Sequence, residues 1–381
     1  MLTSITQLHT TDFKPFAGKR SFLTFMLRVS LFYLLSTLLL SCQTTSRFHE
    51  FQHKEVHHFE MVRIGGVKQA ILINGNNKDN PVLVFLHGGP GFPMLPFDPF
   101  CESMKQLEDQ YTIVYWEQRG TGKSFNRRIN RESMNVDQFV NDTREVIDFV
   151  RNRLNVDKVF LWGHSWGSNV GALYAARYPE TLHAYISTGQ SVNPFENERL
   201  AYEFVLEHAT RDNNRRALRQ LARIDTMPEN YTLDHALTIR KWVYRYGGIV
   251  HHNDNERPYV DWNEIATILT TPVYSLGVRI NLLLNPYFSA EVLWEDLKGI
   301  DLISQAPKIE VPVYFLVGRH DIIVSHVLAH KYFEQLKAPN GKELIWFEQS
   351  AHRPHAEEPE KFLSIMKGSV RNEFNPSFTS N

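Results

Sequence analysis

The sequence has little cysteine and almost no net charge, and each absence excludes a class of protein. Only 2 of its 381 residues are cysteine, which excludes a disulfide-rich scaffold and a cysteine-based zinc cluster. The 41 lysine and arginine residues nearly balance the 42 aspartate and glutamate residues, so the formal net charge is -1. The overall charge therefore gives no electrostatic argument for nucleic-acid binding.

Repeats and phosphate motifs are missing as well. The chain contains no internal repeat and no low-complexity tract, which argues against a solenoid and against a disordered polymer. It contains no G-x-x-x-x-G-K-[ST] sequence, the pattern of a phosphate-binding P-loop. The composition is that of a globular protein, 43% apolar and 22% charged, and the length allows a large core or two domains.

The N-terminus has the organisation of a secretory signal. Four basic residues precede an apolar run over 29–40 that is too short for a comfortable membrane span. The run ends in the sequence LLSC, which resembles the lipobox of bacterial lipoproteins. Residues 1–41 are therefore predicted to be a signal peptide, and Cys42 is predicted to carry the lipid. An uncleaved signal anchor is the alternative, and either Met1 or Met26 can be the true start.

Lipidation would place the protein on a membrane. Residues 42–58 are polar and lack periodicity, so they are predicted to form a tether. The expected location is the cell envelope, anchored to the inner or the outer membrane and facing outward from the cytoplasm, without spanning the bilayer. With Cys42 consumed, Cys101 would be the single remaining cysteine, so an internal disulfide is excluded.

From residue 59 onward, segments with strand patterns alternate with segments of helical spacing. Strands are predicted at 59–64, 67–73, 82–86, 111–116, 158–162, 182–187, 311–317 and 343–347, and helices at 136–154, 165–178, 325–336 and from 357. This alternation predicts an α/β fold, a mostly parallel sheet with helices on both faces. It stops near residue 190 and resumes after 301. The prediction is an α/β core, 59–190 and 302–381, interrupted by a helical cap over 191–301.

The sequence GHSWG, residues 163–167, matches G-x-S-x-G between a predicted strand and a predicted helix. A nucleophile on a tight, strained turn needs small flanking residues, and the following helix N-terminus favours developing negative charge. Ser165 is therefore the candidate nucleophile. The alternative is that this serine only caps the helix.

The sequence HGGPG, residues 87–91, follows another predicted strand. Acyl transfer develops an oxyanion that needs preorganised N–H donors, each contributing about 3–4 kcal/mol of transition-state stabilisation. The backbone N–H groups of Gly89 and Trp166 are the candidate donors. An ordinary Gly-Pro turn is the alternative.

A serine nucleophile needs a base, and the base needs an orienting acid. Asp321 and His352 each follow a predicted strand, at the strand ends where α/β sheets place their sites. Together with Ser165 they have the chain order of an α/β-hydrolase triad, serine then acid then histidine. His355 is the rival base and Asp301 the rival acid.

Three sequences together resemble the proline iminopeptidase family of α/β-hydrolases: HGGPG at 87–91, WEQRGTGKS at 116–124 and GHSWG at 163–167. The resemblance covers roughly 59–190 and 311–362, about half of the chain. It implies an α/β-hydrolase fold and an aminopeptidase that removes an N-terminal residue, often proline, from short peptides.

The resemblance also implies roles for particular residues. Gly89 would supply an oxyanion donor, and the turn at 118–124 would shape the site. Glu117 departs from the family, which more often has aspartate there. Binding the ammonium group of a peptide needs acidic side chains in the cap, and the cap segment begins with four candidates: Glu196, Glu198, Glu203 and Glu207. A solvated acidic helix face is the alternative.

The sequence thus predicts a serine hydrolase, an aminopeptidase of proline iminopeptidase type that works through an acyl-enzyme. An esterase or amino-acid amidase with the same triad is the second hypothesis, and a binding lipoprotein without turnover is the third. The mechanism requires no metal and no organic cofactor. The expected partner is a short peptide or another small acyl substrate, with no nucleic acid, and the oligomeric state stays open.

Overall fold

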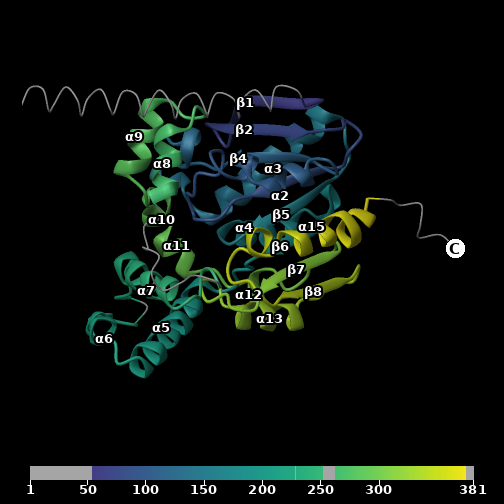
Figure 1. The fold of residues 1–381 in the computed structure, drawn as a ribbon. Helices are drawn as coiled ribbons and strands as arrows, with labels where there is room; N and C mark the ends of the chain where they lie inside the picture. Colours follow the sequence, from purple (N-terminus) through teal and green to yellow (C-terminus); the bar gives the residue numbers. More distant parts are fainter. Residues whose placement is uncertain (1–53, 228, 252–261, 375–381) are drawn as a thin grey trace, which may run out of the picture.

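The structure is a computed structural model that describes residues 54–227, 229–251 and 262–374 (Figure 1). The predicted signal peptide and Cys42 lie outside the described residues. Within the described part of the chain, no helix combines the length and the apolarity that crossing a bilayer requires.

Eight strands form a single sheet in the order β1-β2-β4-β3-β5-β6-β7-β8. Their bounds are β1 Val56–Ile64, β2 Val67–Gly75, β3 Val82–Leu86, β4 Thr112–Glu117, β5 Val159–His164, β6 Leu182–Thr188, β7 Val313–Gly318 and β8 Lys342–Phe347. The β1–β2 hairpin joins β4 in antiparallel pairing, and every neighbour pair from β4 to β8 is parallel. The predicted fold class is confirmed.

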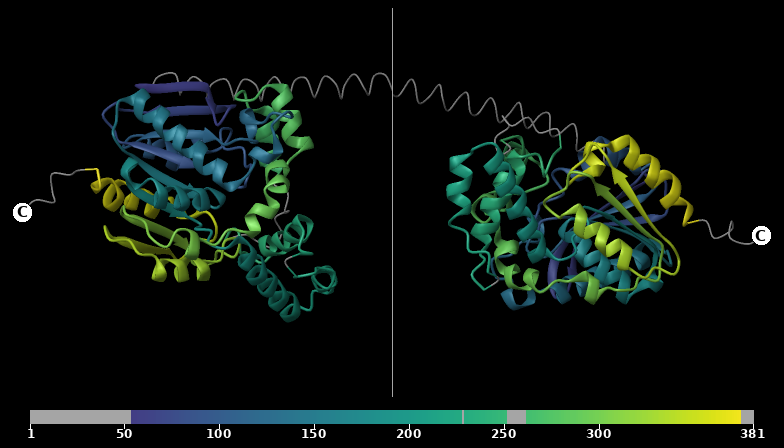
Figure 2. Two further views of the ribbon diagram at one scale, coloured as in Figure 1. Left: turned by 180° about the vertical axis from the view of Figure 1, so that it is seen from behind. Right: turned by 90° about the horizontal axis from the view of Figure 1, so that it is seen from below.

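Helices cover both faces of the sheet, as Figure 2 shows from two further directions. One face packs against α3 (Val136–Leu154), α4 (Trp166–Arg177), α12 (Leu302–Gln305) and α13 (His326–Gln335), and the other against α2 (Glu102–Leu107) and α15 (Pro359–Ile365). Strand β3 contributes side chains to the hydrophobic cores on both faces of the sheet, because successive side chains of a strand point to opposite faces. Val84 belongs to the first core and Phe85 to the second.

The segment between β6 and β7 is helical in the residues that the structure describes. Its helices are α5 (Pro194–Arg211), α6 (Arg215–Leu221), α7 (Leu233–Arg245), α8 (Trp262–Thr270), α9 (Leu276–Leu284), α10 (Phe288–Val292) and α11 (Trp294–Lys298). Helices α5, α6 and α7 form a lobe beyond the edge of the sheet layers (Figure 1). This lobe has its own hydrophobic core, in which Val205, Ile239 and Trp242 are buried. We call the part of this segment from α5 to α11 the cap; α12, which follows it, packs on the sheet.

One predicted boundary is wrong. The tether was expected to run to residue 58, but β1 already begins at Val56 and pairs with β2 along its whole length. His57 is held there by a 2.7 Å hydrogen-bond contact between its Nδ1 and the side-chain oxygen of Asn74. The mixture of polar and apolar residues in this edge strand hid its periodicity, because one of its faces is partly solvated.

Candidate active site

Ser165 occupies the sharp turn between β5 and α4. Its backbone has φ 55° and ψ -122°, a conformation that a residue with a side chain rarely adopts. The neighbouring glycines make the turn possible. A Cβ on Gly163 would lie 2.5 Å from the carbonyl oxygen of Gly167, and a Cβ on Gly167 would collide with the carbonyl of Leu86 in β3. The G-x-S-x-G spacing therefore follows from close packing around the serine.

His352 and Asp321 form a buried hydrogen-bonded pair. The Nδ1 atom of His352, in the loop after β8, lies 2.9 Å from Oδ2 of Asp321, in the loop after β7. The other oxygen of Asp321 accepts a hydrogen bond of 3.1 Å from the backbone N–H of Val324, so the carboxylate is fixed. On the opposite side, Gly189 has φ +56°, and a Cβ there would come within 3.0 Å of the imidazole of His352.

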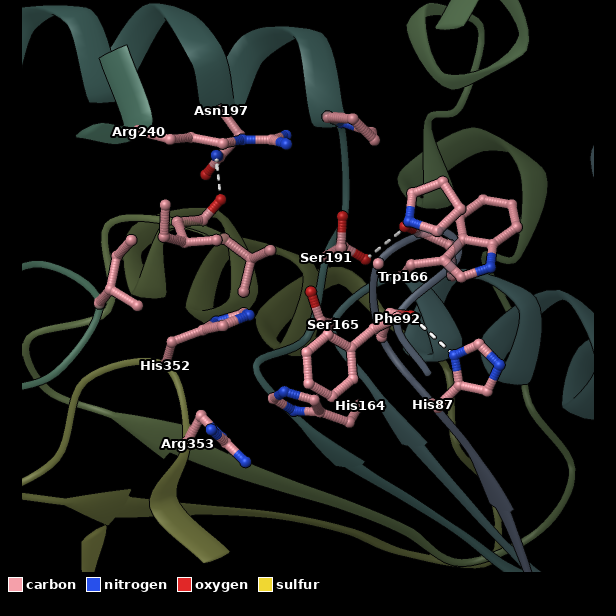
Figure 3. A pocket seen from close by; sticks show the side chains of 18 of the residues that line it. His87, Phe92, His164, Ser165, Trp166, Ser191, Asn197, Arg240, His352 and Arg353 are labelled. Atoms are coloured by element: carbon pink, nitrogen blue, oxygen red, sulfur yellow. Dashed lines mark hydrogen bonds between the residues drawn. The ribbon is translucent and has the colours of Figure 1, made fainter. Parts of the chain in front are cut away.

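Ser165 and His352 line the same cavity of about 290 Å³ between the core and the cap. Figure 3 shows the imidazole pointing toward the serine hydroxyl, with Asn197 and Arg240 of the cap on the opposite side of the cavity. No hydrogen bond joins the two side chains in the described structure. Active-site hydrogen bonds of unliganded enzymes often tighten only when substrate binds, so this geometry is compatible with a relay.

The HGGPG loop and the start of α4 meet at the serine. Gly89, with φ +124°, and Trp166, the first residue of α4, both line the cavity. Gln118 connects them. Its side-chain N–H donates to the carbonyl of His87 at 3.1 Å, and its side-chain oxygen accepts from the indole N–H of Trp166 at 2.8 Å. The turn after β4 thus shapes the site by holding the two candidate oxyanion segments together.

The rest of that turn is tied to the core. The guanidinium of Arg119 makes two hydrogen bonds with the carboxylate of Asp142 in α3, at 2.6 and 2.7 Å, and both side chains are fully buried. Glu117 accepts from the backbone N–H of Lys123 at 2.7 Å and from the hydroxyl of Tyr274. Burial raises the pKa of Glu117 to about 7 despite these donors. These contacts position the turn and do not reach the cavity.

Two further histidines lie close to His352. The rings of His164 and His352 have centroids 4.9 Å apart, and those of His164 and His355 are also 4.9 Å apart. Burial, together with the nearby His352, holds the pKa of His164 far below its ordinary value, and burial does the same for His355. His355 lines the cavity, but the hydrogen bond to Asp321 is made by His352. The rival acid, Asp301, precedes α12 and accepts from the hydroxyl of Ser304 at 2.9 Å, away from the cavity.

The structure separates the four glutamates predicted in the cap. Glu198 is buried and lines the cavity. Glu196 and Glu203 form ion pairs with the exposed Arg199 instead, and Glu207 is exposed. None of these three lines the cavity, so their positions do not support the predicted contact with a substrate ammonium group. The helical repeat places them on the outer face of α5, because they stand two, five and nine residues from Glu198, which at about 100° per residue is roughly 140–180° around the helix.

Glu198 is engaged by neighbours that sequence reasoning missed. Its Oε2 accepts a hydrogen bond of 2.9 Å from the hydroxyl of Tyr231, and its Oε1 accepts one of 2.9 Å from the guanidinium of Arg240. Two other missed residues, Asp98 and Arg353, line the core side of the cavity. None of the four belongs to a recognisable motif. Arg353 alone had a local signal, since it directly follows the candidate base His352.

Comparisons with known proteins agree with the fold. The sequence profile of the alpha/beta hydrolase fold matches residues 81–359. A Bacillus subtilis protein named probable aminopeptidase YbaC is 31% identical over 327 residues, which cover 84% of this chain and 98% of the relative. A proline iminopeptidase of Heyndrickxia coagulans is 26% identical over 294 residues, 76% of this chain and 90% of the relative.

Solved structures share the fold at lower identity. A proline iminopeptidase of Mycobacterium smegmatis superposes with a TM-score of 0.59 at 18% identity, covering 83% of this chain and 98% of that chain. The protein VinJ superposes with a TM-score of 0.57 at 19% identity, covering 84% of this chain and 99% of that chain. These likenesses show the fold.

Proposed function

The chain belongs to the α/β-hydrolase family, as a proline iminopeptidase-like member, and on that premise we propose that it is a serine aminopeptidase that removes N-terminal residues from short peptides. The observation that carries the proposal is the convergence of Ser165 with the hydrogen-bonded pair His352 and Asp321 on one cavity. The aminopeptidase names of the relatives support the peptidase assignment.

The proposed reaction has two halves. His352 takes the proton of Ser165 as its oxygen attacks the substrate carbonyl, and Asp321 stabilises the imidazolium that forms. The backbone N–H groups of Gly89 and Trp166 stabilise the oxyanion. The protonated imidazole then gives its proton to the leaving amine, which leaves an acyl-enzyme on Ser165. Water activated by His352 releases the acyl group and restores the serine.

The cavity limits the size of the substrate. Its volume of about 290 Å³ suits a small acyl group with a short leaving group, and the cap lies above the nucleophile. Apolar side chains from both walls, among them Phe92, Leu297 and Ile323, line it. A folded protein substrate cannot reach Ser165 through such an enclosure without movement of the cap.

Turnover of amino-acid coumarin amides tests the proposal. The purified wild-type protein should hydrolyse alanyl and prolyl amides that have a free amine, and the Ser165→Ala variant should lose on the order of 10⁴-fold or more of this turnover. The variant should unfold at the same temperature as the wild type, since it removes one buried hydroxyl. Equal turnover by the two proteins would reject the serine mechanism.

The engagement of Glu198 favours a second candidate function, an esterase or amino-acid amidase with the same triad. Both oxygens of Glu198 already accept hydrogen bonds from cap residues, so the described part of the cap wall offers no unpartnered carboxylate for a peptide ammonium group. A simple acyl ester would need no such group. Faster turnover of butyryl esters than of every aminoacyl amide would favour this candidate over the aminopeptidase.

We also propose that the protein is a lipoprotein anchored through Cys42. The support is the basic segment, the apolar run 29–40 and the lipobox-like ending in the sequence. Metabolic labelling with a palmitate analogue should label the wild-type protein and leave the Cys42→Ser variant unlabelled. Equal labelling of both would reject the anchor without affecting the hydrolase proposal.

A further inference from the structure

Among the residues that the structure describes, two acidic side chains line the cavity, and they differ in their partners. Glu198 on the cap wall accepts from Tyr231 and Arg240, as described above. Asp98 on the core wall begins the short turn η1 (Asp98–Phe100) and is 7% exposed. Among the residues that the structure describes, none donates a hydrogen bond to the Asp98 carboxylate, which lines the cavity. Asp98 is therefore the carboxylate that lacks a partner.

A buried carboxylate without a donor is costly, because it gives up its hydration and receives nothing in exchange. Arg353 is the charged neighbour whose field acts on Asp98, and it also lines the cavity (Figure 3). No ion pair within 4.0 Å joins the two side chains in the described part of the chain. Arg353 thus compensates the charge of Asp98 in part and leaves the carboxylate oxygens open to the cavity.

The same environment keeps Asp98 ionised at neutral pH. Burial raises its pKa to about 6, and the field of Arg353 opposes a larger rise. The cavity lining also includes Phe85 and Phe92, and burial keeps the pKa of His355, another lining residue, far below its ordinary value. A small cation that enters this cavity meets an anionic oxygen in a poorly solvated site, where charge-assisted hydrogen bonds are strongest.

We propose that Asp98 binds the ammonium group of the substrate, and that the core wall selects substrates with a free amine. The inference rests on the proposed function, because it assumes that Ser165 in the same cavity attacks the carbonyl beside that amine. The ligand class is a small acyl compound with a primary or secondary amine, such as the N-terminal residue of a short peptide. Glu198 then has a structural role: its hydrogen bonds hold α5 against α7 and against the segment that carries Tyr231.

A matched pair of substrates tests the proposal. Alanyl and propionyl coumarin amides differ only in the amino group, and both are assayed with the full-length wild-type protein and the Asp98→Asn variant. We expect the variant to lose about 10- to 100-fold in kcat/KM on the alanyl amide, mainly through KM, and to keep propionyl turnover within about twofold. An equal loss on both substrates would overturn the proposal, since a general structural effect does not distinguish them.

Glu198→Gln is the matched control, since it neutralises the other acidic side chain of the same cavity. It should change the turnover of the two substrates by the same factor. A selective loss of alanyl turnover in Glu198→Gln, with none in Asp98→Asn, would assign the ammonium site to the cap and contradict the proposal.

The pH dependence of the wild-type protein tests the proposal without any variant, so misfolding of a variant cannot affect the result. As the pH falls through about 6, Asp98 gains a proton and loses its attraction for the ammonium, so the alanyl-to-propionyl ratio of kcat/KM should fall. The neighbouring Cys101, Tyr115 and Tyr274 stay uncharged in this range, because burial raises their pKa values. A ratio that does not change between about pH 5 and 7 would contradict the proposal.

Protonation of the buried Glu117, which lies outside the cavity, affects both substrates alike and therefore cancels in the ratio. The outcomes also separate this inference from the proposed function. If Ser165→Ala abolishes turnover but Asp98→Asn is unselective, the ammonium site fails and the hydrolase stands. If Ser165→Ala leaves the hydrolysis of both amides unchanged, the proposed function itself fails.

Discussion

The cavity has a cap wall, formed by residues of the cap, and a core wall, formed by residues of the α/β core. Each wall carries one acidic side chain, and the two side chains differ in their hydrogen-bond partners. On the cap wall, Glu198 is 6% exposed and has a hydrogen-bond donor on each of its carboxylate oxygens. On the core wall, Asp98 is equally buried at 7% but has no donor among the described residues. The comparison teaches that burial of a carboxylate beside a nucleophile does not by itself indicate a substrate contact. What matters is whether the protein has already satisfied its oxygens.

The walls also differ in what they contribute to the reaction. The core wall carries Ser165 and His352 together with the HGGPG loop, all at strand ends, and Asp321 forms a hydrogen bond with His352 from the loop after β7. The cap wall carries side chains from helices that pack on their own hydrophobic core. We therefore expect substitutions on the core wall to affect chemistry and substitutions on the cap wall to affect stability and access.

The largest effect that we expect in this comparison is that of Asp321→Asn. The amide would keep the shape but would no longer stabilise an imidazolium at His352, and kcat should fall on the order of 10⁴-fold for every substrate. Steady-state kinetics on a coumarin amide and on a simple ester check this. A loss confined to one substrate class would mean that Asp321 is not the orienting acid.

A smaller core-wall effect is expected from Gln118→Ala. The substitution removes the side chain that connects the carbonyl of His87 with the indole of Trp166. The two segments that carry the candidate oxyanion donors are then no longer held in place relative to each other. We expect kcat to fall about 10²-fold with a small change in KM, as for other misplacements of about 1 Å in active sites. An unchanged kcat would show that the loop is positioned without this glutamine.

On the cap wall, Glu198→Gln should mainly reduce stability. The glutamine cannot neutralise Arg240, so we expect a loss of about 1–3 kcal/mol in the free energy of unfolding and less than about tenfold in turnover. Chemical denaturation followed by tryptophan fluorescence measures the first quantity. If stability is unchanged while turnover falls 100-fold, Glu198 acts on the substrate, and the contrast between the two walls disappears.

The smallest effect is expected from Glu203→Gln on the outer face of α5. Its ion pair with Arg199 is solvent-exposed, so the free energy of unfolding should change by less than about 1 kcal/mol and turnover should not change. This variant is the surface control for Glu198→Gln, since both neutralise one glutamate of the same helix. A loss of turnover in this variant would indicate that the outer glutamates contact the substrate.

The sequence allowed the alternation of strands and helices to be predicted because buried parallel strands leave continuous apolar runs such as that of β3. Ser165 and the HGGPG loop were also recognisable, because a strained turn and a close backbone approach each require glycine at fixed positions nearby. These requirements leave a short local pattern in the sequence, even where the atoms that meet the glycine lie far along the chain. The chain order of the triad then suggested Asp321 and His352 as partners.

The sequence could not be used in the same way to predict which carboxylate of the cavity already has hydrogen-bond partners. Whether Glu198 is satisfied depends on Tyr231 and Arg240, 33 and 42 residues further along the chain, which carry no local signal. Asp98 belongs to the first part of the α/β core in the sequence and Arg353 to the second, so only the fold brings them to the same cavity. The lack of a hydrogen-bond donor to Asp98 among the described residues is a property of packing, and no spacing rule encodes it.

The most direct test of the account is to identify the residue that reacts with a fluorophosphonate. The purified protein is labelled with the probe, digested, and mapped by mass spectrometry, with and without prior incubation with an alanyl amide. We predict one modified peptide, with the adduct on Ser165 and with labelling slowed by the amide. An adduct on another residue, or no reaction in a folded protein, would contradict the assignment of Ser165 as the nucleophile.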